Sequence, residues 1–488
     1  MSDEIKNIQP KELWENFYKL TQIPRPSNHE EKIQDFIFSF GKGLGLETIK
    51  DEAGNIIIRK PATPGMENLK GVILQGHLDM VPQKNSDKAH DFLNDPIEAC
   101  IDGEWVTANG TTLGADNGIG VALAMAVLAS KDIEHGPIEV LFTATEETGM
   151  DGANGLKPGV LQGEILLNTD SEDEGELYVG CAGGEDANIT FSYAEEGVPM
   201  GFAGIKLSVT GLKGGHSGID IPLGRGNAIK LFFRILNEAY QRLGVRLAGI
   251  DAGSLRNAIP REAFGVLAVD EAKIADFAAL VEEITGDIKN ELSVADPNLY
   301  ISIEETAVPE KVVDEKTQVN LTLGIIACPN GVIRMSDSMP GLVETSTNLA
   351  IVKSDPEKGT IEGACLMRSS VDSAKEELAS RIKAVFTLAG AEVSFSGAYP
   401  GWKPDMDSPI LKTMQGVYKK RFGKIPEIRA IHAGLECGIL GGKYPHWDMI
   451  SFGPTIRFPH SPDEKVNIES VQKIWDFLVE TLKNIPEK

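Results

Sequence analysis

The hydrophobic positions of this chain follow two periods. Near the start, Leu13, Phe17 and Leu20 are spaced as i, i+4 and i+7, which predicts an amphipathic helix over residues 10–22 that ends before Pro24. Further along, short apolar runs alternate with helical stretches. Strands are predicted at residues 55–59, 71–76, 138–142 and 165–169, and a helix of small residues at 121–129. This alternation indicates an α/β domain with helices packed on a sheet.

A second helix is predicted directly after the first. Ser27 and Glu30 have the spacing of a capping box, in which the hydroxyl and the carboxylate reciprocally satisfy free backbone amides. Ile33, Phe36 and Ile37 then form the apolar stripe of the helix.

Two passages rich in Gly and Pro, residues 181–184 and 397–404, indicate domain boundaries. The region between them is predicted to be an α+β domain. Its predicted strands cover residues 205–210, 321–326 and 348–351, and its predicted helices cover residues 227–241 and 272–292. We therefore expect a catalytic domain in two parts, residues 1–186 and 400–488, split by an inserted domain at 187–399.

Composition narrows the classes of function. With 72 acidic and 47 basic residues, the 488-residue chain has a formal charge of -25, which would repel nucleic acid and anionic membranes. Its five cysteines show no C-x-x-C spacing, and no long apolar run or N-terminal apolar leader is present. These features predict a cytoplasmic protein with reduced thiols.

Three residues with metal-binding side chains follow predicted strands: His77, Glu147 and Asp170. In open α/β sheets, ligands bind outside the carboxyl ends of the strands, so these side chains are expected to converge. Asp79, two residues after His77, is expected to contact the far nitrogen of that imidazole and orient it, not to bind metal.

Other candidate ligands are individually ambiguous. Asp116 lies among glycines before a helix, where it could cap the helix or bridge two metal ions. Glu146 and Glu147 are adjacent; in extended chain they would diverge, so that one binds metal and the other acts as a base, although an exposed loop would also tolerate both. His460, between two prolines, could be an ordinary loop histidine.

Five segments share one order with a known superfamily: Gly76–Asp79, Gly114–Gly118, Thr145–Glu147, Asn168–Asp170 and Pro459–His460. Together they resemble the dizinc exopeptidase and deacylase superfamily, and more closely its cytosolic aminoacyl-histidine dipeptidase branch (peptidase D, or Xaa-His dipeptidase). The resemblance implies a zinc-exopeptidase catalytic domain, with helices packed on a mixed sheet, that is split by an α+β lid and dimerisation domain. It also implies a homodimer formed through that lid domain.

The same resemblance implies a metal site of two zinc ions. Asp116 and a water would bridge them; His77 and Asp170 would hold one ion, and Glu147 and His460 the other. Glu146 would be the general base, Asp79 would orient His77, and the peptide bond after Asp116 would be cis. Manganese or cobalt would also suit imidazole and carboxylate ligands.

Four residues resemble substrate-binding positions of that superfamily: His216, Asn257 and Arg368 in the inserted domain, and Gly434 in the last part of the chain. His216 would steady the oxyanion in its own or a partner subunit, unless it is only a turn histidine. Arg368 would clamp a free carboxylate through its planar fork, unless it forms a surface ion pair. Four further histidines match no ligand position and are expected to be structural, namely His29, His90, His135 and His446.

These features predict hydrolysis of unblocked dipeptides of broad sequence, including Xaa-His and β-alanyl-histidine. A tripeptidase or an N-acyl amino acid deacylase could use the same metal ligands. A metal- or peptide-binding protein without activity is the third alternative, but it would have no need of Glu146 as a base.

Overall fold

The computed structural model describes residues 2–488 and divides the chain into two compact units. Within the described residues, unit 1 comprises 2–180, Pro404–Ala430 and Leu435–Lys488, and unit 2 comprises Cys181–Lys403 and Ile431–Gly434. The boundaries expected from the sequence, after residues 186 and 399, lie a few residues from these. The return of residues 431–434 to unit 2 has no counterpart in the prediction.

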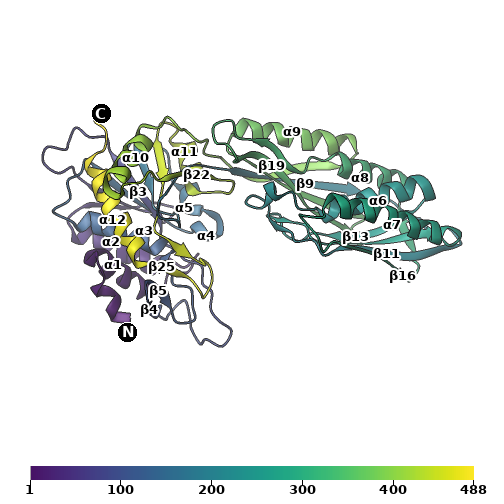
Figure 1. Ribbon diagram of the computed structural model, residues 1–488, viewed down its shortest axis with the longest axis horizontal. Coiled ribbons are helices and arrows are strands. Elements are labelled where there is room, and N and C mark those ends of the chain that lie inside the picture. The colour runs from purple at the N-terminus through teal and green to yellow at the C-terminus, as the bar shows by residue number, and fades with distance from the viewer. Residues whose placement is uncertain (1) are drawn as a thin grey trace. The chain divides into compact units, whose positions relative to one another are not determined.

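Unit 1 is built on an eight-stranded mixed sheet (Figure 1). Its strands, in spatial order, are β1 (Glu47–Lys50), β2 (Ile56–Lys60), β6 (Ile138–Thr143), β3 (Val72–His77), β7 (Ile165–Asn168), β23 (Asp448–Ser451), β8 (Glu176–Cys181) and β22 (Glu427–Ile431). The central strands β6, β3, β7 and β23 are parallel to their neighbours in that group. The four strands predicted for this region are confirmed as β2, β3, β6 and β7.

The central strands are hydrophobic because they are covered on both faces. Every residue of β3, β6 and β7 is buried, as expected for parallel strands between layers of helices. The helices of unit 1 are α1 (Lys11–Thr21), α2 (Glu31–Gly43), α3 (Ala115–Ala129), α4 (Glu146–Gly149), α5 (Asp151–Gly155), α10 (Pro409–Phe422), α11 (Glu436–Lys443) and α12 (Ile468–Lys483), preceded by the 3-10 helix η1 (Ser2–Asn7). Parallel strands end at a common edge, and that edge receives the loops that follow β3, β6 and β7.

The first predicted helix is confirmed as α1, with Leu13, Phe17 and Leu20 buried. The helix predicted at residues 121–129 is also confirmed, but α3 begins earlier, at Ala115. Its first turn is irregular, because Asp116 and Asn117 have non-helical backbone angles and are joined by a cis peptide bond.

The capping box predicted for α2 is wrong. The helix begins at Glu31, and its N-cap residue, Glu30, makes no side-chain capping bond. The Ser27 hydroxyl instead donates to Asp79 Oδ2 at 2.7 Å. Glu30 Oε1 accepts from the Thr145 amide at 3.0 Å and from its hydroxyl at 2.8 Å. Tertiary partners have therefore replaced the local ones.

A smaller antiparallel sheet completes unit 1. It contains β24 (Ile456–Arg457), β25 (Lys465–Asn467), β5 (Trp105–Ala108) and β4 (Ala99–Asp102). The turn between β24 and β25 carries His460, whose backbone has a positive φ of 59°. This pairing of late strands with early ones brings the end of the chain to the first part of unit 1.

Unit 2 is an α+β unit with a nine-stranded sheet. The main path of the sheet follows β16 (Tyr300–Thr306), β11 (Phe202–Thr210), β15 (Ala263–Asp270), β13 (Arg246–Ala252), β19 (Val343–Asp355), β20 (Thr360–Ser369), β9 (Gly183–Ser192) and β21 (Glu392–Tyr399), and β18 (Gly331–Met335) pairs with β19. Four helices contact this sheet: α6 (Ala228–Leu243), α7 (Ile274–Glu291), α8 (Glu315–Ala327) and α9 (Asp372–Leu388). Short elements complete it: η2 (Ile221–Leu223), η3 (Glu271–Lys273), β10 (Glu195–Gly197), β17 (Lys311–Val313), β12 (Gly215–His216) and β14 (Ala258–Ile259). Their shared core is apolar, with Phe232, Phe277 and Phe386 fully buried.

Most elements predicted in this region are confirmed, but the strand predicted at residues 321–326 is wrong. These residues lie in α8, where the Asp314 side chain caps the helix by accepting from the Thr317 amide. Gln318, Leu321 and Ile325 are buried at helical spacing. A short apolar run does not by itself distinguish a buried helix from a strand.

None of the helices in residues 2–488 combines the length and hydrophobicity that a bilayer crossing requires.

Candidate active site

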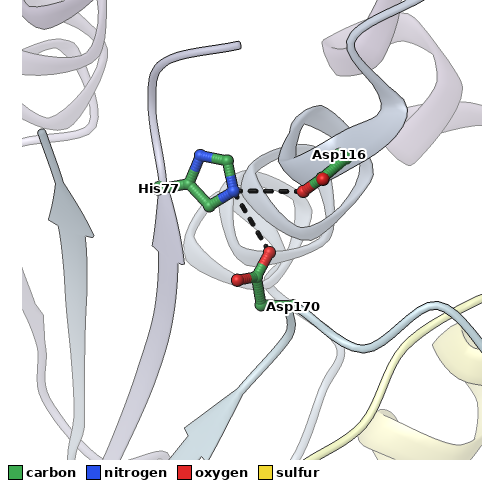
Figure 2. A group of neighbouring side chains, drawn as sticks. All are labelled: His77, Asp116 and Asp170. Atoms are coloured by element: carbon green, nitrogen blue, oxygen red, sulfur yellow. Dashed lines mark hydrogen bonds and ion pairs between the residues drawn. The ribbon is translucent and has the colours of Figure 1, made fainter. Parts of the chain in front are cut away.

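His77 is the last residue of β3 and is almost completely buried. Its Nε2 lies 3.1 Å from Asp116 Oδ1 and 3.2 Å from Asp170 Oδ1, and Figure 2 shows the two carboxylates pointing toward this nitrogen. Asp170 is there because β7 runs parallel to β3 and ends beside it. Side chains 93 residues apart in sequence thus meet at one edge of the sheet.

Asp116 also faces a second histidine. Its Oδ2 lies 3.1 Å from His460 Nε2, and the same nitrogen lies 3.1 Å from Glu147 Oε2. Among the described residues, the Asp116 carboxylate has its hydrogen bonds with His77 and His460 and none with an amide of α3, so the helix-cap interpretation of this residue is wrong. Its two oxygens instead face two different imidazoles.

Ligand atoms within 4.8 Å of one another form three groups. The first is His77, Asp116 and Asp170; the second is Asp116, Glu147 and His460; the third is His77, Glu146 and Glu147. Asp116 belongs to both of the first two groups. That sharing is the arrangement a carboxylate needs in order to bridge two ions.

The expectation that Glu146 and Glu147 lie in extended chain is wrong. They form the first turn of α4, and Asp79 holds that turn in place. Asp79 Oδ1 accepts from the Glu146 amide at 3.0 Å, and Oδ2 accepts from the Glu147 amide at 3.2 Å. Glu147 Oε2 faces His460, while a carboxylate oxygen of Glu146 lies within 4.8 Å of ligand atoms of His77 and Glu147.

Asp79 also contacts His77, with its Oδ1 3.3 Å from Nδ1. The Asp79 main-chain oxygen lies 3.2 Å from the same nitrogen. Because both oxygens accept hydrogen bonds, they favour the tautomer of His77 with its proton on Nδ1. The lone pair of Nε2 can then bind a cation.

The site concentrates negative charge in a buried place. Burial and the charges of Asp116 and Glu147 raise the pKa of Asp170 to about 7, against the opposing effect of His77. Burial also raises the pKa of Glu146 well above its ordinary value, and the charge of Asp170 adds to the rise. Glu147 Oε1 is buried without a hydrogen-bond partner among the described residues. Divalent cations would neutralise these carboxylates and fill that vacant coordination, so the donor set fits a pair of metal ions.

Hydrogen bonds to Asp116 and Glu147 raise the pKa of His460 to about 11. Burial raises the pKa of Asp116, but hydrogen bonds from His460 and His77 outweigh it and hold that pKa below its ordinary value. Each imidazole thus favours the ionised form of the carboxylate that they share.

Arg368, in unit 2, is not a surface residue. It is 5% exposed, and among residues 2–488 it forms no ion pair, so the surface ion-pair alternative is wrong. Its Nη1 donates to the Tyr399 hydroxyl at 3.2 Å, and its Nε lies 3.5 Å from Ser217 Oγ. A buried guanidinium without a carboxylate partner is suited to binding an anionic group.

His216 is half-buried in unit 2 and has a defined tautomer. Its Nδ1 accepts hydrogen bonds from the amides of Gly218 at 3.2 Å and Ile219 at 3.1 Å. Burial lowers its pKa, and the charge of Arg368 adds to the effect. The neutral ring therefore carries its proton on Nε2, which can donate to a developing oxyanion.

Asn257 and Gly434 lie near these two residues within unit 2. The Asn257 carbonyl accepts from the Ser217 amide at 2.8 Å, next to His216. Gly434 packs on the ring of Tyr399, where a Cβ would lie 3.1 Å from Cε2. Unit 2 thus gathers all four predicted substrate-binding residues around Ser217 and Tyr399.

Sequence reasoning missed Arg25 and Glu464, and it gave Ser27 and Glu30 a capping role instead of a supporting one. All four contact the segments that carry the metal-binding candidates. Glu464 follows His460 by four residues, and that proximity was the available indication. Among residues 2–488, His29, His90, His135, His432 and His446 belong to no metal-binding group.

We expect buried His432 to make the stability of the folded protein sensitive to acid. Burial, helped by the charges of Arg368 and His216, lowers its pKa from 6.5 to about 3. Between about pH 3 and pH 6.5 the unfolded chain binds a proton on this histidine that the folded chain excludes. The contribution of His432 to the free energy of unfolding is therefore fully present above pH 6.5 and falls by about 1.4 kcal/mol per pH unit below it. We expect His432→Gln to flatten the decline of the melting temperature with acid. The exposed-histidine variant His446→Gln should keep the wild-type slope, and an unchanged slope in His432→Gln would contradict the prediction.

The interrupted α/β fold and the shared-carboxylate cluster together define a metallopeptidase. The model of the peptidase family M20/M25/M40 matches residues 73–484, and the chain belongs to this family. The family is metal-dependent and typically dinuclear.

Two dipeptidases are similar to this chain over almost its whole length. The cytosol non-specific dipeptidase of Escherichia coli K12 is 50% identical over 485 residues, which cover 99% of this chain and 100% of the relative. The crystal structure of aminoacylhistidine dipeptidase from Vibrio alginolyticus is similar with a TM-score of 0.95 and 51% identity, covering 100% of both chains. The Bacillus cereus aminopeptidase PepT shares the fold alone, with a TM-score of 0.58 at 16% identity, 98% of this chain and 99% of that one.

Proposed function

We propose that this protein is a dinuclear metallodipeptidase that hydrolyses unblocked dipeptides. The observation that carries the proposal is the position of Asp116, whose two oxygens face His77 and His460 at 3.1 Å each. The full-length similarity to two dipeptidases supports the choice of substrate class.

His77 and Asp170 would hold one ion, Glu147 and His460 the other, and Asp116 both. Zinc is the proposed metal, and manganese and cobalt suit the same ligands. When bound, the ions polarise the scissile carbonyl and make the attacking water more acidic.

Glu146 is the proposed general base. It takes a proton from water as the water oxygen attacks the carbonyl carbon, and it delivers that proton to the amine nitrogen as the carbon–nitrogen bond breaks. Asp79 keeps the base in place through the Glu146 amide.

The residues of unit 2 provide the proposed substrate contacts. Arg368 binds the free carboxylate, His216 donates from Nε2 to the oxyanion, and Asn257 and the Gly434 backbone bind the remaining polar groups. This assignment favours short substrates with a free carboxyl terminus. Unit 2 would also form the interface of a homodimer, and the enzyme would act in the cytoplasm.

The test is a panel of four substrates with metal-stripped and zinc-restored protein: alanyl-histidine, β-alanyl-histidine, a tripeptide and an N-acetyl amino acid. Dipeptide cleavage confined to the restored protein is the expected result. Cleavage of the tripeptide alone or of the acetylated substrate alone would overturn the dipeptidase assignment. Absence of any cleavage would favour a binding protein.

Replacement of Arg368 by Met is expected to raise KM for dipeptides by about 10- to 100-fold, because hydrogen bonds to a charged group contribute about 1.5–3 kcal/mol. Steady-state kinetics with a dipeptide and with its C-terminal amide measure the effect. The C-terminal amide lacks the carboxylate, so it should be a poor substrate of the wild type. Its KM should change little in the Arg368→Met variant. Arg334→Met, which removes an exposed arginine of unit 2, is the control, and an unchanged KM in Arg368→Met would refute the carboxylate role.

A further inference from the structure

Arg25 is a buried cation that binds two segments of unit 1. It is 2% exposed. Its Nη1 donates to the main-chain oxygens of Leu78 at 2.9 Å and Asp79 at 3.0 Å, and its Nη2 donates to that of Gly114 at 2.5 Å. One side chain thereby ties the exit of β3 to the loop before α3.

Glu464 binds the same loop through its carboxylate and is also 2% exposed. Its oxygens accept hydrogen bonds from four successive amides, those of Leu113, Gly114, Ala115 and Asp116, at 2.8, 3.0, 2.7 and 3.2 Å. Because Glu464 follows His460 closely, it connects the turn that carries His460 to the loop that carries Asp116. Groups from opposite ends of the chain thus hold one loop.

The two side chains carry opposite charges. Burial lowers the pKa of Arg25, and the charge of Glu464, followed by that of Asp79, opposes this effect. A Cβ at Gly114 or Gly118 would lie 2.6 Å from Arg25 Nη2. The glycines that flank Asp116 therefore leave room for the guanidinium.

We infer that Arg25 and Glu464 are positioning residues that set the direction of Asp116, so that its two oxygens reach both metal ions. The inference rests on the proposed metal site. A carboxylate that serves two ions must be placed accurately, because any displacement that improves its contact with His77 alters its contact with His460. Glu464 holds four amides of the loop that leads to Asp116, and Arg25 holds one of its carbonyls. These hydrogen bonds restrict the movement of the Asp116 backbone before metal binds.

Two substitutions test the inference, Glu464→Gln and Arg25→Met. The amide of Gln would present donors to amides that are themselves donors, and Met removes every hydrogen bond of the guanidinium. We expect each variant to bind zinc about 10- to 100-fold more weakly and to lower kcat more than it raises KM. Arg25→Lys, which keeps the charge, should recover part of the affinity. The measurements are zinc titrations against a competing chelator on apoprotein shown to be folded by circular dichroism, and dipeptide kinetics at saturating zinc.

Glu139→Gln is the matched control. Glu139 is also a buried carboxylate of unit 1 that accepts from two backbone amides, those of Gln162 at 2.7 Å and Gly163 at 2.8 Å, and from Arg59 Nε at 2.9 Å. It lies near the start of β6, away from the exits of the strands. This variant should lower the melting temperature and leave zinc affinity unchanged.

The outcomes separate two failures. If the wild type binds two ions and Glu464→Gln and Arg25→Met bind them equally well, the positioning role is overturned and the proposed function stands. If the wild type binds no ions, both are overturned. Should Arg25→Met not fold, Gly118→Ala provides the second variant, since its methyl group would press on Nη2; weaker zinc binding is expected there, and unchanged binding would overturn the inference.

Discussion

Replacement of Glu146 by Gln should lower kcat by about 100- to 10,000-fold, the range that general-base catalysis supplies, while both metal ions remain bound. Gln keeps the volume of the side chain and the amide contact with Asp79, but it cannot accept a proton from water. Glu146 lies within 4.8 Å of His77 and Glu147 and does not belong to either of the groups that share Asp116. The loss should therefore affect turnover and not metal content.

Single-turnover and steady-state assays with a dipeptide, together with metal analysis of the same samples, measure this result. Glu147→Gln is the informative neighbour, because it removes a proposed ligand and should reduce metal affinity as well as activity. A Glu146→Gln enzyme with wild-type kcat would refute the role of the base. Equal metal loss in both variants would show that Glu146 is a ligand.

Replacement of Asp116 by Ala should have the largest effect on metal content. Asp116 is the residue common to the two proposed ion sites, so its removal should weaken both, whereas Asp170→Ala should weaken one. We expect the bound-metal stoichiometry to fall from two toward zero in the first variant and toward one in the second. Dipeptidase activity should fall below detection in Asp116→Ala.

Elemental analysis after gel filtration, and zinc titration of the stripped proteins, distinguish these stoichiometries. Asp173→Ala, in the same acidic run as Asp170 but outside every metal-binding group, should retain two ions. An Asp116→Ala protein with two tightly bound ions would rule out a bridging role for this carboxylate.

The sequence predicted four of the eight strands in the sheet of unit 1, and three of these, β3, β6 and β7, are buried at every residue. Continuous apolar runs indicated β2, β3, β6 and β7, and the residues that follow such runs placed His77, Glu147 and Asp170 at a common edge. Predictions from neighbouring residues failed where a side chain formed hydrogen bonds with residues distant in the sequence instead. Ser27 and Glu30 have the spacing of a capping box, yet they bind Asp79 and Thr145.

The sequence by itself determined the α/β class, the interruption by a second α+β region and the set of candidate ligands, because these depend on periodicity and on residue type. Only the tertiary structure decided which ligands meet. It placed Asp116 between two histidines and turned Glu146 and Glu147 into the start of a helix. It also buried Arg25 and Glu464 against the loop of Asp116. These outcomes depend on hydrogen bonds between residues up to 351 positions apart, and such long-range partners leave no periodic pattern in the chain.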